Sequence, residues 1–156
     1  MAVHSFKTVQ IIPITIEEAW DFFSSPSNLQ SLTPSNINFR IISRHHGLKM
    51  YSGQIIEYKV KPFLNIPFYW MTEITHVQEE TLFIDEQRFG PFSMWHHQHH
   101  FKKVDGAVEM TDIVYYKVPG WWLGDLVNAI YVEKEVKKIF DYRGKRIEEL
   151  FGSKSL

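Results

Sequence analysis

The chain has 156 residues, the length of one ordinary domain, and 44% of them are hydrophobic while 22% are charged. This composition excludes an intrinsically disordered chain, and a net charge of -1 provides no positive field that would hold a nucleic acid backbone. Cysteine is absent, which excludes disulfides, thiolate metal sites and a cysteine nucleophile. We therefore expect one domain over residues 1–156 and no nucleic acid partner.

Two further features bound the class of protein. The N-terminus carries no basic stretch followed by an apolar run, and no run of 18 apolar residues occurs, so we expect a cytoplasmic protein without integral membrane association. Aromatic residues make up 15% of the chain, and four of its eight histidines fall between His96 and His100. A plain hydrophobic core does not need so many rings and imidazoles.

The first predicted element is a strand over Val3–Ile12, and two capping-box patterns follow it. Thr15 with Glu18 predicts a helix start, after which apolar residues recur at helical spacing. Ser27 with Gln30 predicts a second helix of one to two turns that ends before the next proline. Two short helices are therefore expected after the first strand.

The middle of the chain reads as strands, and its end reads as one long helix. Short connections exclude crossover helices, so the strands form an antiparallel meander, and an apolar stripe from about Leu123 to Phe151 predicts an amphipathic helix. A curved sheet with one free face needs such a cover, which predicts an α+β helix-grip fold: a seven-stranded curved antiparallel sheet around the C-terminal helix, with an internal cavity. The predicted middle strands are Ile37–Arg44, Gly53–Lys61, Pro67–Glu79, Leu82–Phe89, Ser93–Val104 and Ala107–Val118.

Asp105-Gly106 is a strong signal for a two-residue hairpin turn and sets a register. Pairing Val104 with Ala107 places Lys102 opposite Glu109, and this pair of opposite charges marks the solvent side. The other face then points to the core. It carries Trp95, His97, His99 and Phe101, opposite Tyr116, Val114, Asp112 and Met110.

Two imidazoles and a carboxylate on an inner face need hydrogen bonds or solvent, and three explanations fit. His97, His99 and Asp112 could supply the few polar contacts of a ligand cavity, could bind a metal, or could form a satisfied core pair without chemistry. His99 with Asp112 could also act as an acid–base pair. Because the sequence identifies no third metal ligand, we expect no metal and no cofactor.

Asp85 and Gln87 share a face with Phe83 by alternation and are further candidates for cavity groups. Their strand follows the Gln78–Thr81 turn, which can close in two ways. In the first register, Ile74 lies opposite Asp85. In the second, His76 lies opposite Asp85 and Glu73 lies opposite Arg88. The sequence does not distinguish the two registers.

Two features of the C-terminal region also allow more than one interpretation. Arg143 lies on the apolar stripe of the long helix, so it reaches out to solvent, pairs with Asp112 or Asp85, or faces a ligand anion, and we favour the first. Trp121-Trp122 predicts either a buried contact at the helix start, which we favour, or an exposed rim that could touch a membrane surface.

At this point the sequence resembles the START/Bet v1-like (SRPBCC) helix-grip superfamily, and within it the bacterial cell-division-inhibitor-like subset. The resemblance covers nearly the whole chain, and the order and spacing of the motifs carry it. A small departure is Ala107-Val108-Glu109, where relatives often have Gly-Thr. The motifs are Trp20-Asp21-Phe22-Phe23, Pro26-Ser27-Asn28-Leu29, Leu32-Thr33-Pro34, Trp70-Met71-Thr72-Glu73-Ile74, Phe83-Ile84-Asp85-Glu86-Gln87, Gly90-Pro91-Phe92, Trp95-x-His97-x-His99-x-Phe101, Met110-x-Asp112-x-Val114-x-Tyr116 and Ile139-Phe140-Asp141-Tyr142-Arg143.

The resemblance implies a cavity for lipids, polyketides or other apolar ligands, and it agrees with the inward histidines. Our main hypothesis is therefore binding of a small apolar or aromatic ligand between sheet and helix. The alternative is an enzyme of the polyketide cyclase, aromatase or dehydratase type, with His99 and Asp112 as candidate catalytic residues. The expected ligand-binding residues are Trp70, Asp85, Gln87, Trp95, His97, His99, Asp112, Tyr116 and Arg143.

Overall fold

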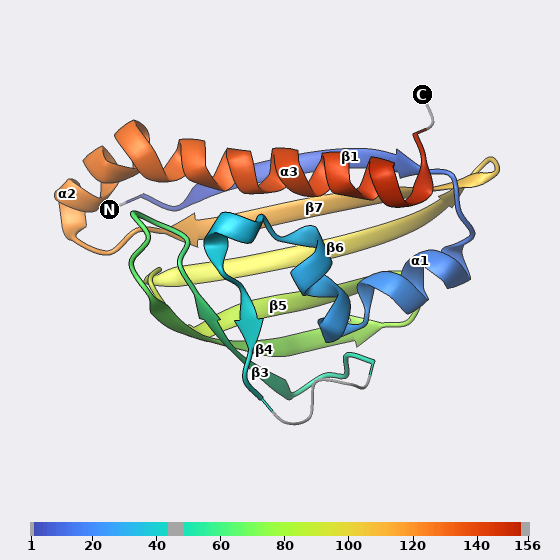
Figure 1. Cartoon of the computed structure of the whole chain (residues 1–156), viewed down its shortest axis with the longest axis horizontal. Helices are drawn as coiled ribbons and strands as arrows, with labels where there is room; N and C mark the ends of the chain where they lie inside the picture. Colours follow the sequence, from blue (N-terminus) through green and yellow to red (C-terminus); the bar gives the residue numbers. More distant parts are fainter. Residues whose placement is uncertain (1, 44–48, 154–156) are drawn as a thin grey trace.

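A computed structural model describes residues 2–43 and 49–153, apart from the side chains of residues 121 and 122. One sheet of seven antiparallel strands curves around the C-terminal helix, which runs across its inner face in Figure 1. The predicted α+β helix-grip fold is confirmed. The strands are β1 (His4–Ile12), β2 (Arg40–Ile41), β3 (Gln54–Val60), β4 (Phe68–Gln78), β5 (Leu82–Phe89), β6 (Met94–Val104) and β7 (Ala107–Lys117).

The strand order is β1-β7-β6-β5-β4-β3-β2, so β2 to β7 form a meander and β1 closes onto β7. Each neighbouring pair in this meander is antiparallel, as the short connections require. The helical segments are α1 (Ile16–Phe23), η1 (Pro26–Leu32), η2 (Ser35–Ile37), α2 (Trp121–Val127), η3 (Asn128–Val132) and α3 (Glu133–Phe151).

One of the two predicted capping boxes forms. The Thr15 hydroxyl accepts a hydrogen bond from the Glu18 backbone, and the Glu18 carboxylate accepts one from the Thr15 backbone. A short helix does form at the second position and ends before Pro34, but its predicted capping box does not, because η1 is a 3-10 helix with Pro26 at its start and no side-chain cap. Ser27 instead exchanges a hydrogen bond with the hydroxyl of Ser25.

The predicted strand Ile37–Arg44 is largely wrong. Residues Ser35–Ile37 form the 3-10 turn η2, which ends at Asn38 with a backbone φ of 49°. This left-handed residue redirects the chain, so that β2 begins only at Arg40. The end of the predicted strand lies outside the described residues, as do His45 and His46.

The predicted register of β6 and β7 is confirmed. Val104 pairs with Ala107 and His99 with Asp112. His97, His99 and Asp112 are buried on the inner face, while Lys102 on the other face is exposed. Alternation around the Asp105-Gly106 turn therefore places the charged cluster inside the molecule.

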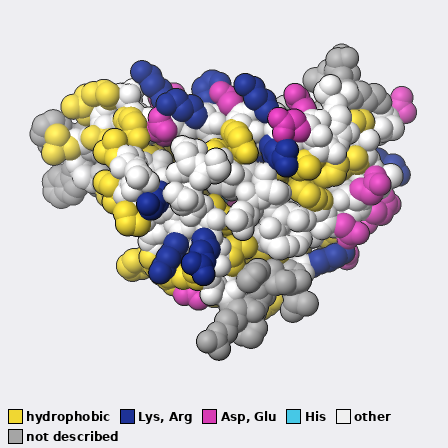
Figure 2. Space-filling view, in the orientation of Figure 1, with side chains coloured by type: hydrophobic (Ala, Val, Ile, Leu, Met, Phe, Trp, Pro, Cys, Tyr) yellow, Lys and Arg dark blue, Asp and Glu magenta, His cyan; other side chains and the backbone are white. Residues whose placement is uncertain are grey.

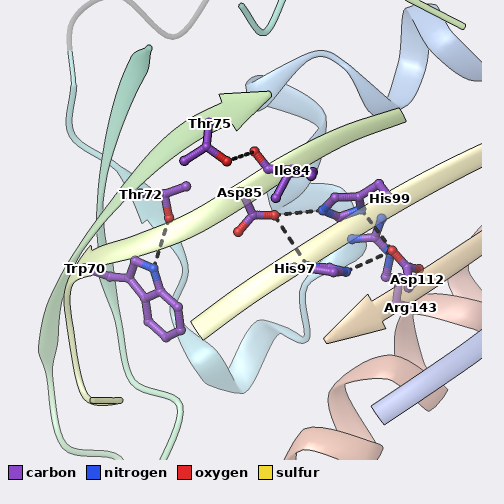
Figure 3. A network of polar contacts seen from close by, with 9 residues as sticks. All are labelled: Trp70, Thr72, Thr75, Ile84, Asp85, His97, His99, Asp112 and Arg143. Atoms are coloured by element: carbon purple, nitrogen blue, oxygen red, sulfur yellow. Dashed lines mark hydrogen bonds and ion pairs between the residues drawn. The ribbon is translucent and has the colours of Figure 1, made fainter. Parts of the chain in front are cut away.

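A β-bulge at Thr75 sets the register of β4 against β5. Next to the turn His76 pairs with Ile84, but beyond the bulge Ile74 pairs with Asp85. The first of the two predicted registers therefore holds at Asp85. Figure 3 shows the Thr75 hydroxyl hydrogen-bonded to the backbone of Ile84 beside this irregularity.

The C-terminal helical region begins slightly earlier than predicted and contains one π-helical turn, η3, between α2 and α3. The apolar stripe of α3 is buried against the sheet, with Phe140 and Ile147 among its members. In Figure 2, hydrophobic side chains gather at the end of the molecule where α2 lies. Within α2 and η3, the described hydrophobic residues with more than 40% exposure are Leu123, Leu126, Val127 and Ile130.

Trp121-Trp122 opens α2, and its side chains lie outside the described part of the structure. Both interpretations of this pair therefore remain predictions. Among the helices of the described residues, none combines the length and apolar character needed to cross a membrane.

Candidate functional site

A cavity of about 180 Å³ lies between the sheet and α3. Apolar and aromatic side chains form most of its wall, contributed by η1, by strands β3 to β6 and by α3. The polar groups on this wall are Thr33, Tyr58, Thr72, Asp85, His97, His99 and Arg143. An apolar hollow with a few converging polar groups is the usual construction of a small-molecule site.

A cluster of four charged or titratable side chains extends across three neighbouring strands beside the cavity. Asp85 on β5 pairs directly with His97 on β6, and His99 on β6 pairs directly with Asp112 on β7. Since His97 and His99 are two residues apart, both imidazoles point to the inner face and lie between the two carboxylates. Figure 3 shows this sequence of side chains, with Arg143 approaching from α3.

The contacts in this cluster differ in length and alignment. His99 Nε2 lies 2.7 Å from Asp85 Oδ2, and His97 Nε2 lies 2.9 Å from Asp112 Oδ1. His97 Nδ1 is 3.4 Å from the same Asp85 oxygen, too far for a good hydrogen bond. His99 Nδ1 lies 2.9 Å from Asp112 Oδ1 without the alignment of a hydrogen bond. The two rings contact each other, with centroids 3.7 Å apart.

Arg143 is buried, with 9% of its surface exposed, so our preferred prediction that it reaches out to solvent is wrong. Its Nε lies 3.6 Å from Asp112 Oδ2, and the residue contributes to the cavity wall. The pairing with Asp112 was one of the alternatives. It compensates a buried cation that would otherwise be costly.

The electrostatic surroundings shift the pKa values of the two histidines in opposite directions. Burial and the neighbouring His99 lower the pKa of His97. Burial would also lower the pKa of His99, but its contacts with Asp112 and Asp85 raise it. His99 is thus the better place for a proton, while His97 favours the neutral form.

Both carboxylates remain ionised in this surrounding. Burial would raise the pKa of Asp112, but Arg143 and the contacts with His97 and His99 hold it well below its usual value. Burial likewise opposes ionisation of Asp85, but His97 and His99 lower its pKa. The cluster is therefore a set of mutually compensating charges.

The structure brings six of the nine predicted ligand-binding residues to the cavity wall: Trp70, Asp85, Trp95, His97, His99 and Arg143. Asp112 lies behind the two histidines and borders a separate small hollow of about 20 Å³ together with Arg143. Tyr116 is buried between Phe92 and Trp95, outside the described cavity lining.

Gln87 also lies outside the described lining and has a different contact. Its side-chain amide donates to the backbone carbonyl of Phe92 and accepts from the backbone amide of the same residue, at 2.6 and 3.2 Å. Alternation correctly placed Gln87 on the face of Asp85. It could not show that the connection after β5 folds back over it.

Three polar wall residues were not among the predicted site residues: Thr33, Tyr58 and Thr72. Tyr58 pairs with Trp70 across β3 and β4, and Thr72 accepts a hydrogen bond from the Trp70 indole at 3.0 Å. Burial and the nearby Asp85 raise the pKa of Tyr58, which keeps its phenol neutral. Alternation along Gln54, Ile56, Tyr58 and Val60 was the signal that could have identified it.

Comparisons with solved structures identify the fold of the chain. A protein of Chromobacterium violaceum superposes with a TM-score of 0.73 at 10% identity, covering 96% of this chain and 98% of the other. The major latex-like protein 151 of Panax ginseng gives 0.68 at 13% identity, covering 96% and 97%. Ara h 8.0201 gives 0.60 at 18% identity, covering 95% and 99%.

The chain has the START/Bet v1-like fold. This confirms the predicted fold, while membership of the superfamily and of its narrower bacterial subset stays a prediction. No family model and no curated protein matches the sequence. Because these three structures are only 10–18% identical to the chain, the function must be argued from the site itself.

Proposed function

We propose that this protein binds a small apolar or aromatic ligand, such as a segment of a lipid or a polyketide-like ring, in the cavity between the sheet and α3. The observation that carries the proposal is the composition of the wall. Apolar side chains surround a hollow of about 180 Å³, and Asp85, His97, His99 and Arg143 meet on its polar part. Such a wall buries a ligand's hydrocarbon and orients its polar end.

The volume of the cavity limits the size of the ligand. An apolar cavity of roughly 150 Å³ can hold one benzene molecule. The space here therefore suits about one aromatic ring or a short acyl segment, and a larger ligand requires side chains to move. Trp70 and Trp95 form an edge-on pair on the wall, with ring centroids 5.5 Å apart, and provide aromatic surface for such a ring.

The test is native mass spectrometry and thermal shift of the full chain against panels of fatty acids and polyphenols. We expect one bound ligand per chain and, at about 100 times the Kd, a stabilisation of about 2.7 kcal/mol. Ile139→Trp tests the location, because Ile139 on α3 lines the cavity and a larger ring there fills it. This variant should lose ligand uptake.

Ile130→Trp is the matched control, since Ile130 lies in the same helical region but is 62% exposed. It should bind as the unmodified chain does. The proposal is contradicted if no compound binds while Ile139→Trp stabilises the protein, because the hollow would then be a packing defect that a larger side chain repairs.

A second function, acid–base catalysis on the bound ligand, is favoured by one observation. His97 donates from Nε2 to Asp112, and its Nδ1 has no close hydrogen bond, as a general base oriented by a carboxylate requires. His99 is less suitable than the sequence indicated, because its Nε2 is engaged by Asp85. Compounds recovered after incubation distinguish the two functions: unchanged masses indicate binding, whereas altered masses that need His97 indicate turnover.

A further inference from the structure

Three electron-pair donors converge beside the cavity. Asp85 Oδ2 lies 2.7 Å from His99 Nε2 and 3.4 Å from His97 Nδ1, and the three possible ligand atoms of these residues all lie within 4.8 Å of one another. Zinc binds imidazole nitrogen at about 2.0–2.1 Å and carboxylate oxygen at about 2.0–2.2 Å, which places neighbouring donor atoms of a tetrahedral site about 3.3–3.5 Å apart. The 3.4 Å separation already fits that spacing, whereas the 2.7 Å contact must lengthen when a metal ion binds.

We propose that Asp85, His97 and His99 bind a divalent first-row transition metal ion, with zinc as the simplest case. Two imidazoles and one carboxylate form a donor set used by zinc and by non-haem iron sites that keep open coordination positions. The sequence supplied the two histidines but no third ligand. The register of β5 against β6 places Asp85 opposite His97 and completes the set.

The outer contact of His97 agrees with this site. A metal-bound imidazole usually directs its other ring nitrogen at a carboxylate, which fixes the orientation of the ring. Here His97 Nε2 donates to Asp112, whereas His99 Nδ1 lies 2.9 Å from the same oxygen without an aligned hydrogen bond. Asp112 is thus a positioning residue behind His97, and Arg143 on its far side neutralises its charge.

The geometry at His97 leaves one ring nitrogen for a metal ion. Because Nε2 is engaged by Asp112, the nitrogen available to a metal is Nδ1, which faces the Asp85 carboxylate at 3.4 Å.

The remaining coordination positions would open into the cavity, since all three proposed ligands contribute to its wall. An oxygen atom of a cavity ligand could then complete the coordination. The metal site itself does not depend on the proposed ligand function. It is tested with the ion alone, so that failure of one leaves the other standing.

The test is calorimetric titration of the chelator-treated full chain with Zn²⁺. We expect one equivalent to bind to the unmodified chain. Asp85→Asn and His97→Gln should each weaken binding by more than about 100-fold, because each removes a direct ligand. Asp112→Asn should weaken it by about 10–100-fold, the usual effect of losing an outer carboxylate partner.

His96→Gln is the matched control. His96 lies on the same strand and pairs with Glu86 of β5 at 2.7 Å, but on the outer face of the sheet. We expect Zn²⁺ binding within about twofold of the unmodified chain. The proposal is overturned if the unmodified chain shows no saturable binding, or if His96→Gln lowers the affinity as much as His97→Gln does.

A measurement without variants covers the case in which a substitution prevents folding. Crystals of the unmodified chain soaked in Zn²⁺ should show an anomalous zinc peak within about 2.0–2.2 Å of Asp85, His97 and His99. A peak only at surface histidines, or no peak, would refute the site.

Discussion

Asp112 and Arg143 show how a buried charge is tolerated in this protein. The carboxylate contacts both His97 and His99 and lies 3.6 Å from the Arg143 guanidinium. Removing one partner from a buried pair typically costs about 3–5 kcal/mol, because the other charge loses its compensation. The cluster therefore holds together as a unit, which explains why one carboxylate is surrounded by three cationic or titratable side chains.

Gln87 shows how neighbouring residues of one strand face can have different roles. Our prediction is that Gln87→Ala lowers the free energy of unfolding by about 1–3 kcal/mol, because the Phe92 backbone amide and carbonyl lose their side-chain partner. Ligand affinity should stay unchanged, since Gln87 lies outside the described cavity lining. Urea unfolding and ligand titration of the same variant measure both effects.

The control for this variant is Gln98→Ala. Gln98 lies on the outer face of β6, where its amide contacts the partly exposed rings of His96 and His100. Water can replace these contacts, so a smaller loss is expected. An unchanged unfolding midpoint in Gln87→Ala would show that the two backbone groups find other partners.

At the level of elements, the capping patterns give the clearest comparison between sequence and structure. We expect Thr15→Ala to lower the free energy of unfolding by about 0.5–2 kcal/mol, because it removes the hydroxyl that accepts from Glu18. Ser27→Ala is the matched control, as Ser27 occupies the corresponding position of a similar pattern, with Gln30 in place of Glu18, without capping a helix. Chemical denaturation compares them, and equal losses would contradict the assignment.

Structural features that depend on residues close together in the chain could be predicted from the sequence. The Asp105-Gly106 turn fixed the pairing of His99 with Asp112, and alternation then set which side chains point inward. The predicted cap at Ser27 does not form because Pro26 starts a 3-10 helix there, so no α-helix begins at this position.

The neighbours of Asp85 depend on features without a local signal. A bulge at Thr75 shifts the pairing of β4 with β5, and the register of β5 against β6 places Asp85 opposite His97. The burial of Arg143 was likewise decided by distance in space, since α3 must first pack on the sheet before its guanidinium meets Asp112. Asp85 and Arg143 could therefore be predicted as candidate cavity residues, but their partners in the cluster could not be chosen from the sequence.

For the molecule as a whole, the charged cluster connects the layers of the fold. Asp85, His97 and Asp112 join three neighbouring strands, and Arg143 links them to α3. His99 stacks on Phe83 in one hydrophobic cluster, while His97 packs edge-on against Phe140 in the other. Disturbing the charges should therefore affect global unfolding rather than one edge of the sheet.

The free energy of unfolding at low pH should depend on the charges of this cluster. The pKa of Asp112 in the folded chain lies well below its ordinary value of 3.8, mainly because Arg143 and the two histidines outweigh the effect of burial. A depressed carboxyl pKa stabilises the fold at pH values above 3.8, and that stabilisation is lost as the pH falls toward the folded pKa. Each unit of depression corresponds to about 1.4 kcal/mol.

We therefore predict that the free energy of unfolding of the chelator-treated chain falls steeply below pH 3.8, and that Asp112→Asn is less stable at neutral pH but loses less on acidification. Asp141→Asn is the control, because Asp141 is an exposed carboxylate of α3 paired only with Lys137 among the described contacts. An exposed pair contributes about 0–1 kcal/mol, so this variant should follow the unmodified chain. Urea unfolding at a series of pH values measures the slopes. If Asp112→Asn and the unmodified chain lose stability in parallel below pH 3.8, the acid sensitivity resides elsewhere, and the buried cluster does not couple the sheet to the helix.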